Sequence, residues 1–166
     1  MSRSNEKKKS KSPENSSFPY RPSLRLRHYD YRGNGYYFVT LCTKNRMPRF
    51  STSTAKALVQ KYLEQIPRFF AGVSIDQSVV MPNHLHVILV LQSSEKSLDR
   101  VIQVFKSWVT REWKLGYSIW QPNFYEHVIR NEAALMKIRE YIVNNPVADK
   151  IDCAQFYGEE RDEENK

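Results

Sequence analysis

Apolar positions along the chain form short β-like runs that alternate with stretches of helical spacing. Residues 54–68 repeat apolar side chains at helical spacing, and so does the stretch that follows Ser97. A last helix is predicted over 132–145, beginning after Asn131 as its cap and stopped by Pro146. Three runs rich in β-branched and aromatic side chains predict strands: residues 36–43, 73–80 and 84–91.

A short extended stretch around Trp120 and Tyr125 completes the order strand, helix, strand, strand, helix, short strand, helix. This order predicts an α+β fold in which helices pack on one face of an antiparallel sheet. One folded domain is expected over 20–152. The Lys- and Ser-rich residues 1–19 and the acidic residues 153–166 offer little to bury, so both are expected to be disordered tails.

The charge of the folded part is more basic than the whole chain indicates. The net charge is +8, and residues 149–166 contribute −4, so residues 1–148 carry +12. Such a domain attracts polyanions, which favours nucleic acid as a partner. Candidate phosphate contacts are Arg25, Arg27, Lys106 and Arg111. Candidate base-stacking side chains, which could equally belong to the core, are Trp120, Phe124 and Tyr125.

Neither membrane insertion nor a disulfide framework is expected. The longest strongly apolar run, Val87 to Leu91, is far shorter than a membrane span. The Lys-rich amino terminus has no apolar stretch typical of a signal peptide. Two cysteines are too few for a disulfide framework, and reduced thiols fit a cytoplasmic protein.

Two histidines in the run HLHVILV are candidate metal ligands. Side chains alternate across a strand, so His84 and His86 share a face, with their Cα atoms roughly 6.5–7 Å apart. Two imidazoles can converge on one divalent cation and leave positions open for phosphate and water. Alternatively, one imidazole is a buried, hydrogen-bonded core residue and the other is solvated.

The predicted last helix carries a candidate nucleophile. Tyr141 and Asn145 are four residues apart and fall on the same helical face. A phenol has a pKa near 10, so it needs a metal or a base to act as a nucleophile. The Asn145 carboxamide could complete the cation's shell. Alternatively, Tyr141 continues the apolar stripe of the helix and Asn145-Pro146 is a plain helix stop.

Four segments together carry a resemblance to a known family. They are RPSLRLRHYDYRGNGYYFVTLCT, VVMPNHLHVILV, SLDRVIQVFKS and WQPNFYEHVIRNEAALMKIREYIVNNPV. In these segments the chain resembles the IS200-like single-tyrosine transposases of the HUH type, closest to the branch associated with repetitive extragenic palindromes (REP). The resemblance covers about residues 21–150. It implies that residues 20–152 are the catalytic domain and that the sheet is ferredoxin-like.

The resemblance implies a metal-dependent enzyme that cleaves and rejoins single-stranded DNA near palindromic hairpins. It implies that His84 and His86 bind Mg²⁺ or Mn²⁺, that Tyr141 forms a 5′-phosphotyrosine, and that Asn145 stands where relatives have a third polar ligand. Glu126 and His127 also match the family pattern, without an assigned role. Family members include dimers, so a homodimer is left open.

Two other functions fit the same residues. A domesticated hairpin-binding protein that no longer cuts would keep the basic surface, but it would need none of His84, His86 and Tyr141. A replication nickase or relaxase would share the chemistry, but relaxases usually carry further domains and this chain is short.

Overall fold

The computed structural model describes residues 34–144, which form one four-stranded antiparallel sheet and three helices. The strand order across the sheet is β2-β3-β1-β4. The strands are β1 (Gly35–Cys42), β2 (Val73–Met81), β3 (His84–Leu91) and β4 (Tyr125–Ile129). The helices are α1 (Ser53–Phe69), α2 (Leu98–Trp113) and α3 (Glu132–Asn144), with a 3₁₀ turn at η1 (Lys44–Arg46).

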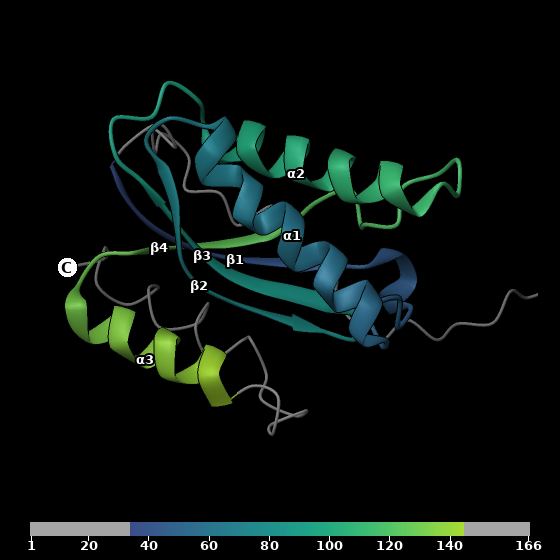
Figure 1. Cartoon of the computed structure of the whole chain (residues 1–166). Helices are drawn as coiled ribbons and strands as arrows, with labels where there is room; N and C mark the ends of the chain where they lie inside the picture. The colour runs from purple at the N-terminus through teal and green to yellow at the C-terminus, as the bar shows by residue number, and fades with distance from the viewer. Residues whose placement is uncertain (1–33, 145–166) are drawn as a thin grey trace, which may run out of the picture.

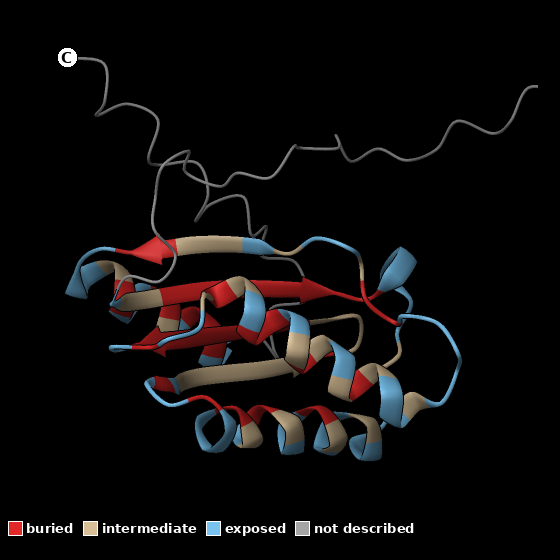
Figure 2. Ribbon diagram, turned by 90° about the horizontal axis from the view of Figure 1, so that it is seen from above, coloured by how far each residue is buried: buried red, intermediate tan, exposed pale blue. Residues whose placement is uncertain are grey.

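The predicted α+β fold with an antiparallel sheet is confirmed. Helices α1 and α2 lie side by side on one face of the sheet, as expected, whereas α3 lies on the opposite face (Figure 1). The two central strands explain this difference. Most residues of β1 and β3 are buried, so the sheet is apolar on both faces and needs a cover on each (Figure 2).

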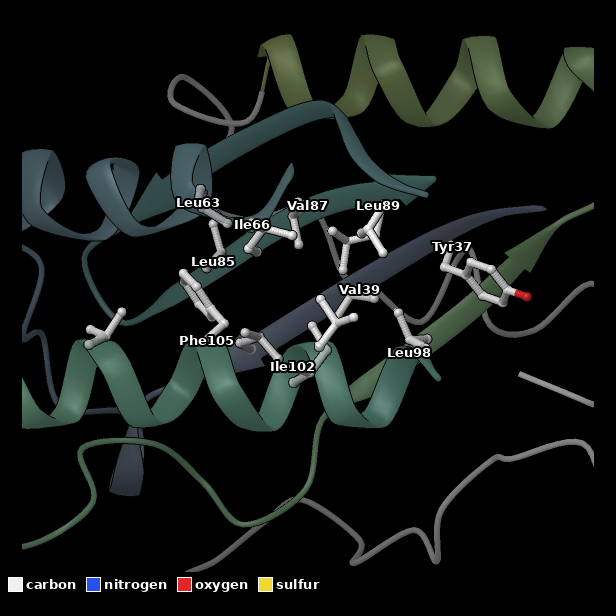
Figure 3. Packing of buried hydrophobic residues seen from close by; sticks show 14 of the residues in the cluster. Tyr37, Val39, Leu63, Ile66, Leu85, Val87, Leu89, Leu98, Ile102 and Phe105 are labelled. Atoms are coloured by element: carbon white, nitrogen blue, oxygen red, sulfur yellow. The ribbon is translucent and has the colours of Figure 1, made fainter. Parts of the chain in front are cut away.

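The larger core lies between the sheet and the pair α1 and α2 (Figure 3). Alternate residues of β3, Leu85, Val87 and Leu89, enter this core, and α2 contributes Ile102 and Phe105. The other residues of β3 therefore face α3. One strand thus supplies the main core with one half of its side chains and leaves the other half for the opposite face.

Side-chain caps fix where two helices begin. The Thr52 hydroxyl accepts a hydrogen bond from the Ala55 amide (3.2 Å) and starts α1. The Asn131 carboxamide oxygen accepts one from the Ala134 amide (2.8 Å), which confirms the predicted cap of α3. Ser97 occupies the N-cap position of α2 but makes no side-chain capping bond.

Several predictions fall outside residues 34–144. These are the tails over 1–19 and 153–166, the domain bounds at 20 and 152, and residues Arg25, Arg27 and Asn145. Within the part of the chain that the structure describes, no helix is both long and apolar enough to span a membrane.

Candidate active site

The two histidines of β3 lie together on the face of the sheet that α3 covers. Their rings are 4.6 Å apart between centroids and inclined by 74°. His86 is completely buried, and its ring stacks on Phe38 of β1 at 5.3 Å. His84, at the beginning of β3, is half-buried. The pair therefore joins an enclosed imidazole to one that solvent can reach.

Each imidazole is held through its Nδ1 atom. The Nδ1–H group of His84 donates to the Oδ1 atom of Asn83 (2.6 Å). The Nδ1 atom of His86 is hydrogen-bonded to the Thr40 hydroxyl of β1 (2.8 Å), which is directly opposite in the strand register. In metal sites a hydrogen bond to one ring nitrogen orients the ligand and frees the other nitrogen. These bonds orient both rings, and Nε2 is in each ring the nitrogen that a metal ion could bind.

The environment of His86 keeps its ring neutral. Burial, and the neighbouring charge of His84, lower the pKa of His86 to about 3. A neutral imidazole has the lone pair that a metal ion requires. At neutral pH the His86 ring is therefore uncharged, which is the form that could bind a metal ion.

Tyr141 of α3 reaches this histidine pair. Its hydroxyl oxygen lies 3.3 Å from the Nε2 atom of His86. Its ring meets Phe38 edge-on, with 6.1 Å between centroids, and only 7% of its surface is exposed. The predicted juxtaposition of His84, His86 and Tyr141 is therefore present within one chain.

His84 and His86 could bind a divalent cation whose coordination shell is completed by other ligands. Among residues 34–144 no group of three or more His, Cys, Asp or Glu side chains could enclose a metal ion. Two imidazoles with hydrogen-bonded Nδ1 atoms are suitable nitrogen ligands, and two ligands would leave coordination positions for other groups. The remaining ligands of such a cation would have to come from outside this group of described side chains.

Lys106 and Arg111 lie elsewhere. They line a groove of about 1010 Å³ between α2 and residues 118–124, on the α1–α2 side of the sheet rather than the Tyr141 side. The Lys106 ammonium donates to the carbonyls of Gln121 (2.6 Å) and Pro122 (3.1 Å), and burial lowers its pKa to about 8. The structure thus separates these two cations from the histidine–tyrosine site.

The aromatic candidates separate into core and surface. Trp120 is 1% exposed and packs against Phe50 and Phe105, and Phe124 packs on the same core. Tyr125 is 41% exposed at the start of β4. Of the three candidate side chains for base stacking, Trp120 and Phe124 therefore belong to the core.

Strand β4 carries the two family-pattern residues without a role. His127 pairs with Phe38 and Glu126 pairs with Val39, across β1. Since residues alternate between faces, His127 is on the face of Phe38 and His86, and Glu126 is on the face of the main core.

A strongly basic loop adjoins the His84 end of the sheet. The amide and the hydroxyl of Thr43, just after β1, both donate to the Asn83 carbonyl at 2.9 Å. The exposed Lys44 and Arg46 follow, and Arg49 donates to the hydroxyl of Tyr117 (3.3 Å). Residues 34–63 contain no Asp or Glu. This end of the sheet therefore presents positive charge close to the histidines.

Comparisons with known proteins agree with this architecture. Residues 32–145 match the family described as transposase IS200 like. An uncharacterized protein of Haemophilus influenzae is 33% identical over 80% of this chain and 92% of its own. A REP-associated tyrosine transposase of Escherichia coli is 31% identical over 73% of this chain and 71% of its own.

A solved structure of a REP-associated tyrosine transposase bound to a REP hairpin has a TM-score of 0.65 and 28% identity, covering 77% of this chain and 74% of that one. Fold and site define an α+β protein with a histidine pair facing a helix-borne tyrosine. The chain belongs to the IS200-like transposase family. The sequence-based identification of this family and its REP-associated branch, and with it the prediction of a transposase, is confirmed.

Proposed function

We propose that the chain cleaves and rejoins single-stranded DNA beside hairpins, with Tyr141 as nucleophile and a divalent cation held by His84 and His86. The observation that carries this proposal is the 3.3 Å separation between the Tyr141 hydroxyl and the His86 Nε2 atom, beside a second imidazole. A protein that only binds hairpins would have no need for this buried contact.

His84 and His86 would hold Mg²⁺ or Mn²⁺ through their Nε2 atoms, and Asn145 is the proposed third protein ligand. Such a cation neutralises charge on the phosphate oxygens and lowers the cost of forming a phenolate. His86 fits the role of a ligand rather than a general base because its pKa of about 3 leaves it unable to retain the phenol proton.

In the proposed step the Tyr141 oxygen forms a bond to phosphorus and the P–O3′ bond breaks. The phenol gives up one proton, and the departing 3′ oxygen takes up one to become a hydroxyl. The 5′-phosphate stays on Tyr141, so a 3′-hydroxyl of another strand can reverse the step without ATP. This conservation of bond energy suits excision and rejoining, which hydrolysis would not.

Hairpin DNA is the proposed partner because the similar solved structure is that of a transposase bound to a REP hairpin. We infer that the strand approaches over the basic loop of Lys44, Arg46 and Arg49, next to the His84 end of the sheet. Arg25, Arg27, Lys106 and Arg111 remain proposed phosphate contacts, and of these Lys106 and Arg111 would bind the DNA away from the scissile bond. Since one chain supplies all three central side chains, a homodimer is not required for the chemistry.

The test is incubation of the full chain with labelled single-stranded DNA that carries a hairpin and its flanks, in Mn²⁺. We expect a shortened product and a protein–DNA adduct on a denaturing gel, with the adduct mapped to Tyr141 by mass spectrometry. Tight hairpin binding without an adduct would identify the non-catalytic binding protein instead.

A further inference from the structure

Helix α3 packs on the sheet through a small apolar cluster of its own, separate from the core that α1 and α2 share. This cluster has seven buried members, four of them on α3 itself, whereas the core shared by α1, α2 and the sheet has twenty-one. On α3 itself the buried side chains are Leu135, Ile138, Tyr141 and Ile142. Apolar packing is non-directional. It holds such a helix against the sheet but specifies its rotation and its position along the axis only weakly.

A bidentate ion pair on the flank of α3 fixes the rotation and the axial position of the helix. The Arg139 Nε atom donates to Oδ2 of Asp76 (2.9 Å), and Nη2 donates to Oδ1 (2.7 Å). The two side chains are 28% and 17% exposed, so the pair is largely shielded from water. A bidentate guanidinium–carboxylate contact fixes direction as well as distance. Among the described residues a second carboxylate, Glu132, lies 3.7 Å from Arg139, and its side chain is 76% exposed.

The sheet is irregular at the residue that makes this contact. In the pairing of β2 with β3, Ile75 is opposite Leu89 and Gln77 is opposite Ile88, so Asp76 is an extra residue in a β-bulge. Bulges redirect side chains and are frequent beside active sites. Here the bulge residue, Asp76, forms the ion pair with α3, the helix that carries Tyr141.

Arg139 is two residues before Tyr141, so a movement at the ion pair passes directly to the nucleophile. Sliding α3 by one residue moves Tyr141 by about 1.5 Å. A displacement of about 1 Å at a reacting atom can cost about 100-fold in rate. The contact of 3.3 Å between Tyr141 and His86 therefore depends on how firmly α3 is held.

We propose that Asp76 and Arg139 are positioning residues: their ion pair, built on the β2 bulge, locks α3 so that Tyr141 is aligned with the histidine pair. This inference rests on the proposed function for its effect on rate. Its structural part, the locking of α3, is independent of that function.

The test compares Asp76→Asn, Arg139→Gln and the double variant with Glu132→Gln, which removes only the exposed carboxylate. Single-turnover cleavage, hairpin affinity and amide hydrogen exchange are measured on the full chain. We expect the rate to fall about 10- to 100-fold in each single variant, with hairpin affinity within about twofold. Exchange should accelerate in residues 135–143 and stay unchanged in α1 and α2. Glu132→Gln should match the parent, since exposed pairs contribute little.

The double variant should lose no more rate than either single variant because both remove the same contact. Additive losses, a parental rate in Asp76→Asn, or accelerated exchange throughout the sheet would each overturn the proposal. If the parent chain itself forms no adduct, the proposed function fails. The exchange in α3 would then still decide whether the ion pair locks the helix.

Discussion

The Nε2 atom of His86 lies 3.3 Å from the hydroxyl oxygen of Tyr141, which joins side chains 55 positions apart in the sequence. His86 comes from the centre of the sheet and Tyr141 from the last helix of the described chain. The contact is buried on the α3 face, away from the main core. Substitutions of side chains on this face of the sheet should therefore affect the chemistry most directly.

Replacing Tyr141 with Phe should abolish the covalent protein–DNA adduct and leave hairpin affinity unchanged. The ring keeps its edge-on contact with Phe38, and losing the hydrogen bond to His86 costs about 1 kcal/mol of stability. Adduct formation on a denaturing gel, together with a thermal melt, measures both effects. Tyr125→Phe, at an exposed position on β4, is the matched control and should form the adduct normally. An adduct that persists in Tyr141→Phe would show that another side chain attacks.

Removing a histidine should weaken cation binding, and this effect can be measured without DNA cleavage. His84→Ala is the informative change because His84 is half-buried, whereas the completely buried His86 would leave a cavity. We expect Mn²⁺ affinity, followed by electron paramagnetic resonance, to fall by more than about 100-fold, beyond the usual cost of losing an outer hydrogen-bond partner. His127→Ala on β4 is the control. Unchanged Mn²⁺ affinity in His84→Ala would refute the ligand assignment, and full cleavage in excess chelator would refute the cation requirement.

Thr40→Val should loosen the site without changing its shape. The substitution keeps the branched side chain but removes the hydroxyl bonded to the Nδ1 atom of His86. An unsatisfied buried polar group costs about 1–3 kcal/mol, and a metal-binding histidine without its partner loses about 10- to 100-fold in affinity. Chemical denaturation and Mn²⁺ titration measure the two effects. Thr40→Ser, which retains the hydroxyl, should remain close to the parent in both; equal losses in Ser and Val variants would argue against the hydrogen bond as the cause.

The basic loop should contribute to the salt dependence of DNA binding. Each phosphate contact with single-stranded DNA adds about 0.7 to the slope of log affinity against log salt. We expect Lys44→Gln combined with Arg46→Gln to lower the slope by about 1.4. Lys56→Gln with Lys61→Gln removes two exposed cations of α1 and is the charge-matched control. Identical slopes in the two double variants would place the strand elsewhere on the molecule.

The sequence predicts those parts of the site that depend on spacing along the chain. Alternation in HLHVILV places His84 and His86 on one face, and helical periodicity places Tyr141 on the buried side of its helix. Both are local patterns. The contact between the strand and the helix is implied by the resemblance to the family, since no local pattern specifies it.

The residues that the sequence does not reveal are those whose partners depend on cross-strand register. Thr40 lies inside the apolar run YYFVTLCT, and only its pairing opposite His86 gives its hydroxyl a role. Asp76 appears as an isolated carboxylate in a strand until the bulge turns it towards Arg139. Asn83 differs from these two residues, because it directly precedes His84 in the sequence and its proximity to that ring is a local feature.

The position of α2 shows the same limit for basic residues. The sequence indicates the polar side of this helix, which carries the predicted phosphate contacts Lys106 and Arg111. Periodicity indicates which side of a helix is polar, but not which face of a sheet the helix covers. In the structure α2 covers the face opposite Tyr141.

The two faces of β3 have a consequence for insertions and deletions. Leu85, Val87 and Leu89 fill the main core, while the residues between them, His86 among these, face α3. Adding or losing a single residue near the start of this strand would exchange the two sets. Imidazoles would then be forced among apolar side chains, and leucine would stand beneath Tyr141. Insertion or deletion of a single residue in β3 should therefore inactivate the protein, even though many apolar substitutions in this strand should be tolerated.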